Sequence, residues 1–134
     1  MMTVPAGVGD DGTVRHLSEQ QTLSALWRGA SVEQMLTHSL SERRVRWLVA
    51  LPDVDGITLR LHHVHDDGDA DFLDVYDFRP VDEDEYFGEG RVVAHCPDAE
   101  TVLQAAVGMG ARPDRWVNAG VIQDEYAALR GPTP

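Results

Sequence analysis

A run of histidines and aspartates occupies residues 62–67, with the sequence HHVHDD. In an extended strand, His63 and His65 would project from the same side about 7 Å apart, a spacing that suits two ligands of one metal ion. Asp67 or His95 could add a third ligand and leave one position open for water, as catalytic Zn²⁺ sites do. One hypothesis from these residues is therefore a small Zn²⁺-dependent enzyme.

Other interpretations of the same residues stay open. The imidazoles can be hydrogen-bonded to the neighbouring aspartates, or they can form a patch whose charge changes at mildly acidic pH. The run resembles the HxHxD motif of metallohydrolases, although Gly68 stands where that motif continues with histidine. The segment 67–71 (DGDAD) also places carboxylates at alternate positions, as a Ca²⁺ loop does, without the residue order of an EF-hand.

The segment from Asp66 to Glu89 is strongly acidic, with 11 acidic residues against one basic residue, Arg79. Such a density of charge attracts basic partners and speeds their encounter. Tyr86 and Phe87 lie inside the run, and aromatic residues among charges are typical of protein interfaces. The sequence therefore predicts a partner-binding surface made of Asp77, Asp82, Glu83, Asp84, Glu85, Tyr86, Phe87 and Glu89. The alternative is that this charge serves solubility alone.

The composition excludes several classes of protein. The 134 residues include 23 acidic and 11 basic side chains, the latter all arginine, for a formal net charge of −12. A basic face that binds nucleic acid directly is therefore not expected. No run approaches the roughly 18 apolar residues of a membrane-spanning helix. The lone Cys96 cannot form a disulfide within the chain, which favours the reducing cytoplasm.

Sequence motifs of the common enzyme classes are missing. The chain has no GxSxG nucleophile motif, no glycine-rich phosphate loop and no HExxH helix. Cys96 precedes Pro97 at the end of an expected strand, where a buried and unreactive thiol is the simplest reading. The sequence thus favours a protein that is not an enzyme and has no cofactor, with Zn²⁺ as the alternative.

Local signals predict two helices at the start of the chain. Ser18 and Gln21 have the spacing of a helix capping box, and Gly29 is a natural end for the helix that follows. Ser31 and Gln34 repeat that spacing and predict a second short helix that ends near residues 39–41.

Strands are expected next, followed by two more helices. Patterns of apolar residues predict strands at residues 45–51, 57–65, 72–78 and 91–96. The first two form a hairpin about the turn 52–56. Asp98 is a suitable cap for a third helix, and the last helical element has Trp116 near its start.

Segregated helices and strands predict an α+β fold. We expect an antiparallel meander of about four strands, flanked by two N-terminal and two C-terminal helices. Residues 1–14 are expected to be a flexible tail, residues 15–130 a single α+β domain, and residues 131–134 a frayed end.

The segment from Gly110 to Trp116, GARPDRW, resembles the GxxP…W ending of some bacterial polymorphic-toxin immunity proteins. The resemblance covers about the last quarter of the chain, and the tail after Trp116 is longer than that ending. It implies a small cytoplasmic protein that binds and neutralises a toxin.

The leading hypothesis is therefore a small acidic protein-binding module. It would be an immunity or inhibitor protein that occludes a basic partner, such as a nuclease toxin or another nucleic-acid-processing protein. Two alternatives remain: the metal-dependent enzyme built on His63 and His65, and a DNA mimic whose carboxylates occupy a duplex-binding groove.

Overall fold

The computed structural model describes residues 15–39 and 42–130 of the chain. The expected tail at residues 1–14 and the expected frayed end at 131–134 lie outside these residues. The elements, in chain order, are α1 (Glu19–Trp27), β1 (Val32–Ser39), β2 (Arg44–Asp53), β3 (Gly56–His65), the 3-10 turn η1 (Val75–Asp77), β4 (Arg91–Cys96), α2 (Ala99–Val107), β5 (Val117–Asn118) and α3 (Ile122–Arg130).

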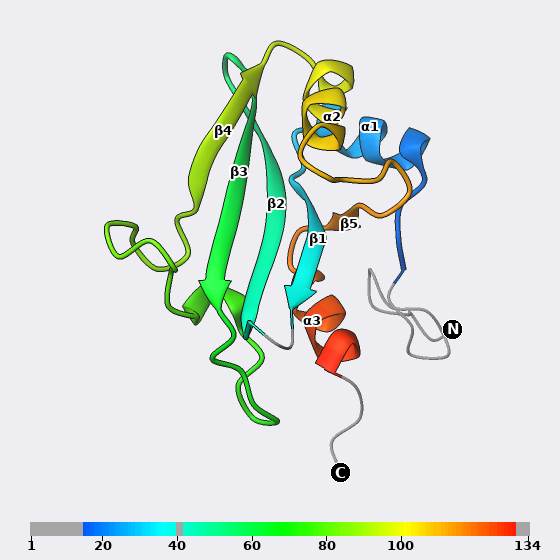
Figure 1. Ribbon diagram of the computed structural model, residues 1–134. Helices are drawn as coiled ribbons and strands as arrows, with labels where there is room; N and C mark the ends of the chain where they lie inside the picture. The colour runs from blue at the N-terminus through cyan, green and yellow to red at the C-terminus, as the bar shows by residue number, and fades with distance from the viewer. Residues whose placement is uncertain (1–14, 40–41, 131–134) are drawn as a thin grey trace.

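Five strands form one antiparallel sheet in the order β4-β3-β2-β1-β5. Strands β1 to β4 follow one another as a meander, and the short β5 pairs with the free edge of β1 (Figure 1). The predicted α+β class is therefore confirmed. Among the described residues the sheet has one strand more than expected, and three helices accompany it, one N-terminal and two C-terminal.

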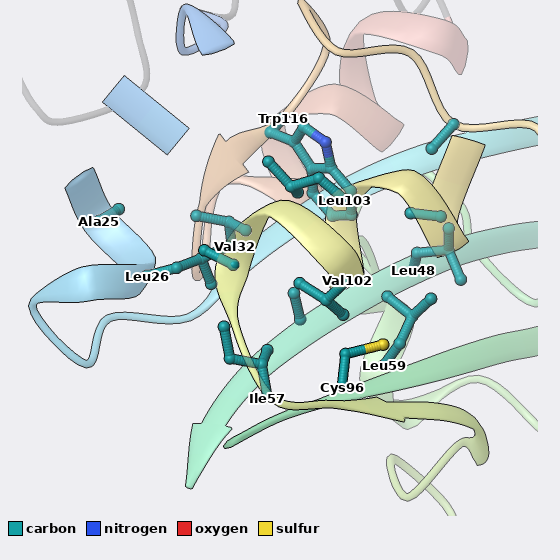
Figure 2. Packing of buried hydrophobic residues seen from close by; sticks show 14 of the residues in the cluster. Ala25, Leu26, Val32, Leu48, Ile57, Leu59, Cys96, Val102, Leu103 and Trp116 are labelled. Atoms are coloured by element: carbon teal, nitrogen blue, oxygen red, sulfur yellow. The ribbon is translucent and has the colours of Figure 1, made fainter. Parts of the chain in front are cut away.

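The sheet buries apolar side chains on both of its faces, because successive residues of β2 point to opposite sides. Leu48 and Ala50 pack with α1, α2 and Trp116 in one core cluster. Figure 2 shows side chains of this cluster, with Trp116 beside Leu103 of α2. Val45 and Trp47 pack on the other face, against α3 and the η1 region.

The elements with strong local signals form where they were predicted. Ser18 accepts a hydrogen bond from the Gln21 amide, and the Gln21 side chain accepts one from the Ser18 amide, so the capping box of α1 is complete. The hairpin of β2 and β3, strand β4 and helix α2 with its cap at Asp98 are likewise confirmed.

The predicted second short helix after Ser31 is wrong, because residues Val32–Ser39 form strand β1; the expected end of that helix at residues 40–41 lies outside the described residues. The strand lies between β2 and β5, and core clusters cover both faces of the sheet, so its buried polar residues need partners. Glu33 and Gln34 are both buried and find those partners in residues far along the chain. These distant bonds override the local helical spacing of Val32, Met35 and Leu36.

The predicted strand at residues 72–78 is also wrong. Only the turn η1 forms there, capped by Asp74, and it places Val75 and Phe78 in the core under α3. The apolar residues of both parities, which suggested a central strand, belong instead to a loop whose apolar side chains pack into the core.

Trp116 was expected near the start of the last helix, but it does not start a helix. It is buried in the cluster with α1 and α2, and α3 begins at Ile122. Within the described residues, no helix is long and apolar enough to cross a membrane.

Candidate protein-binding loop and its surroundings

Residues 82–89, here called the acidic loop, leave the sheet beside β3 and return to it at β4. At the start, the amide of Val81 donates to the carbonyl of His63 over 3.0 Å. At the end, Gly90 packs against His62 with a φ of 71°, and an added Cβ would lie only 2.8 Å from the imidazole Nε2. The loop is therefore held at both ends by neighbouring residues of one strand.

Short local bonds shape the loop between these two ends. The Asp82 carboxylate accepts the amide of Asp84 over 2.9 Å, and the Asp82 carbonyl accepts the amide of Glu85. Arg60 of β3 donates to the carbonyl of Glu89 over 3.2 Å. These contacts give the loop a defined course, so its side chains project from fixed backbone positions.

Two aromatic side chains project from the acidic loop into solvent. Tyr86 is 78% exposed and Phe87 is 59% exposed. Glu83, Asp84 and Glu89 are exposed beside them. All of the predicted partner-binding residues except Asp77 thus lie on this loop, with two exposed aromatic side chains among the carboxylates.

Asp77 and Glu85 complete the predicted surface. Asp77 lies in η1 and is exposed, and the neighbouring carboxylate of Asp74 raises its pKa. Glu85 is half-buried, and burial together with Asp82 raises its pKa, while Arg91 acts in the opposite direction. Both carboxylates therefore sit in the strong negative field of their neighbours.

Acidic residues that precede the loop mostly serve the fold. Asp66 accepts the hydroxyl of Tyr126, and Asp67 forms an ion pair with Arg79 at 2.7 Å. Asp74 caps η1 and accepts the side chain of Gln123 over 3.0 Å. Asp66, Asp67 and Asp74 are therefore bonded to distant parts of the fold, whereas Asp69, Asp71 and Asp77 are exposed, as is most of the acidic loop.

The histidines of residues 62–65 do not share one environment. His62 is buried and stacks on Trp47 at 4.6 Å between ring centroids, while Tyr76 meets both rings edge-on. Burial lowers the pKa of His62 to about 4, and Arg60 contributes in the same direction. This imidazole is a neutral component of the core at physiological pH.

His63 and His65 share one face of β3, as predicted, but their neighbours across the strand pair are arginines. His63 is opposite Arg46 and His65 is opposite Arg44. Burial lowers the pKa of His63, and the two arginines lower it further. A divalent cation would meet repulsion from two guanidinium groups here, so this face does not suit a metal ion.

The other two candidate metal ligands lie elsewhere. His95 is opposite Thr58, seven residues along β3 from His65, which corresponds to about 23 Å. It hydrogen-bonds Thr58 at 3.0 Å, whereas Asp67 is occupied by Arg79. In residues 15–39 and 42–130 no group of three or more side chains is placed to hold a metal ion.

The buried polar contacts of Glu33 were not predicted from the sequence. Glu33 of β1 accepts the hydroxyl of Tyr76 and the backbone amides of Gly120 and Ile122, at the start of α3. Burial raises the pKa of Glu33, and these three donors oppose that shift. Because the partners lie 43 and 87 residues away for Tyr76 and Gly120, no local pattern could have revealed them.

The segment from Gly110 to Trp116 is fixed to β1 and to the start of the described chain. Gln34 bonds both the amide and the carbonyl of Arg112, at 2.7 and 2.9 Å. The Trp116 carbonyl accepts the amide of Leu17 over 2.7 Å. The backbone of this segment is therefore held in place, and the side chains of Arg112 and Arg115 remain exposed.

Comparison of the chain with protein-family models, with curated proteins and with solved structures gives no match. Its function is therefore argued from its own residues.

Proposed function

We propose that the protein is a binding module that uses the acidic loop to dock on a basic face of another protein. The observation that carries this proposal is the pair of exposed aromatic side chains, Tyr86 and Phe87, within a run of exposed carboxylates. Exposed aromatic groups can desolvate at the centre of an interface, while surrounding charges steer the encounter.

The bound module would act by steric and electrostatic occlusion of its partner. A basic face on a protein commonly binds nucleic acid phosphates. The partner class proposed is therefore a nucleic-acid-processing protein, such as a nuclease toxin, in line with the resemblance of Gly110 to Trp116 to immunity proteins. The mechanism needs no bond-making step and no cofactor.

Charge reversal in the loop tests this proposal. Glu83→Lys, Asp84→Lys and Glu89→Lys alter exposed side chains and keep Asp82, which shapes the turn. The control reverses three exposed acids elsewhere, with Asp55→Lys, Glu100→Lys and Asp114→Lys, so that both variants have the same net charge. The partner is first captured from the source lysate with the wild-type protein and identified, and its binding kinetics are then measured.

We expect the loop variant to associate at least 10-fold more slowly than the control at low salt, because steering depends on local charge. Tyr86→Ala with Phe87→Ala should mainly raise the dissociation rate. If the protein covers the nucleic-acid site of its partner, duplex DNA should compete with the wild-type protein for binding to that partner. Equal association rates for the loop variant and the control would contradict the assignment of this surface.

A further inference from the structure

A cleft of about 520 Å³ lies between β1, α3 and the segment from Gly110 to Arg115. This volume falls in the range of roughly 300–1,000 Å³ that is usual for small-molecule sites. The acidic loop contributes no residue to the cleft. The cleft is thus a second feature, separate from the surface proposed to bind a protein partner.

One part of the cleft is apolar. Met35 and Leu36 come from β1, and Ala128 and Leu129 come from the last turns of α3. Leu129 is 47% exposed, so part of the apolar lining of the cleft is in contact with water. An apolar group that entered the cleft would cover this surface and gain the corresponding hydrophobic free energy.

Two arginines bring positive charge to the same cleft. Arg112 and Arg115 both line it, and they come from the segment whose backbone Gln34 fixes. Arg112 approaches Asp114 at 3.6 Å, but both side chains are about two-thirds exposed, and such surface pairs are weak. A planar guanidinium is well suited to bind a carboxylate with two parallel hydrogen bonds.

Among the described residues that line the cleft, Glu125 carries the carboxylate, and this group has partners within the protein. Glu125 is only 9% exposed, accepts from His16 Nε2 at 2.8 Å and also accepts the backbone amide of Met35. Burial raises the pKa of Glu125, whereas His16 and Arg115 lower it. Glu125 therefore has its own partners in His16 and the Met35 amide, and although its charge offsets part of that of Arg115, the exposed guanidinium groups of Arg112 and Arg115 still face the cleft.

We infer that this cleft binds a carboxylate joined to an apolar group, with the carboxylate at Arg112 and Arg115 and the apolar group against Met35 and Leu129. The same chemistry occurs in a free medium-chain carboxylic acid and in the C-terminal residue of a peptide. The inference does not rest on the proposed function, because none of these residues belongs to the acidic loop.

The probes are octanoate and an acetylated tripeptide that ends in leucine with a free carboxylate, each titrated into the full chain and followed by NMR. We expect saturable one-to-one binding of at least one probe, with a dissociation constant near 1 mM for octanoate, as ligands of about ten heavy atoms typically show. Octylamine and the same tripeptide with a C-terminal amide should bind at least 10-fold more weakly. Binding of octanoate alone identifies free acids as the ligand class, and binding of the tripeptide alone identifies chain ends.

Variants locate the site. Arg112→Gln with Arg115→Gln should weaken binding at least 10-fold, while the control Arg28→Gln with Arg91→Gln removes the same charge outside the cleft and should retain it. Leu129→Asn, at an exposed position, should weaken binding without unfolding the protein. Absence of saturable binding for both probes, equal binding of acid and amide, or equal affinities in the two arginine variants would overturn the inference. Partner binding by the acidic loop should not change in the variants at Arg112, Arg115 and Leu129, which lie outside that loop.

Discussion

His62 occupies a site with almost no access to water, between the indole of Trp47 and the backbone of Gly90. Its pKa is about 4 in the folded protein, below the usual 6.5 of an exposed imidazole. As the pH falls below 6.5, the unfolded chain therefore takes up a proton that the folded protein does not, and the free energy of unfolding decreases. Once the pH is below 4, both states are protonated and the loss is complete.

This difference predicts a loss of about 2 kcal/mol in the free energy of unfolding between pH 7.5 and pH 5. Urea unfolding at a series of pH values measures it. The variant His62→Phe keeps an aromatic ring on Trp47 and should show a much smaller loss over this interval. An unchanged pH dependence in His62→Phe would contradict the assignment to His62.

At the scale of elements, the acidic loop depends on the glycine that returns it to the sheet. Gly90 and Gly29 both have positive φ, at 71° and 83°, so an alanine is strained at either position. A Cβ at Gly90 would also collide with His62, whereas nothing lies within 4 Å of a Cβ at Gly29. The two substitutions therefore separate backbone strain from steric collision.

We expect Gly29→Ala to cost about 1 kcal/mol of stability and Gly90→Ala about 3 kcal/mol, since overpacking adds to the strain. Denaturant unfolding of the two variants gives both values. If the losses were equal, the loop would be able to move away from His62, and its fixed course beside β3 would be wrong.

The elements also show how far local sequence signals reach. The capping box at Ser18 and the turn at residues 52–56 act within a few residues, and both were predicted correctly. Strand β1 was missed because Glu33 and Gln34 are stabilised by Tyr76, Gly120 and Arg112, far away in the sequence. The helical spacing of nearby apolar residues, taken alone, assigns such polar residues to the exposed side of a helix.

The candidate sites show the same contrast. The acidic loop could be predicted, because its charges and aromatic residues are contiguous in the sequence. The cleft could not, because His16 and Glu125 meet across 109 residues and Arg115 joins them only in the folded chain. The hypothesis of a metal site considered the spacing of His63 and His65 along one strand. It did not include the arginines that lie opposite them on β2, because this pairing is set by the fold.

At the scale of the whole molecule, charge is distributed unevenly. The net charge is −12, and residues 66–89 alone contribute 1 minus 11, or −10. Of these acids, Asp66, Asp67 and Asp74 are bonded within the fold, whereas the exposed ones, which include Glu83, Asp84 and Glu89 of the acidic loop, repel one another. Self-repulsion of this kind destabilises the folded state at low salt.

Neutralising the exposed loop acids should therefore stabilise the protein, at the expense of partner binding. We expect Glu83→Gln, Asp84→Asn and Glu89→Gln together to raise the Tm by about 2–4 °C at 20 mM salt, which corresponds to a few tenths of a kcal/mol per charge. In 1 M NaCl, where the Debye length is about 3 Å, the difference from the wild type should vanish. The control Glu83→Asp, Asp84→Glu and Glu89→Asp keeps the charge and should leave the Tm unchanged. A rise in Tm that persisted in 1 M NaCl, or that the control also showed, would mean that altered packing and not relieved repulsion stabilises the variant.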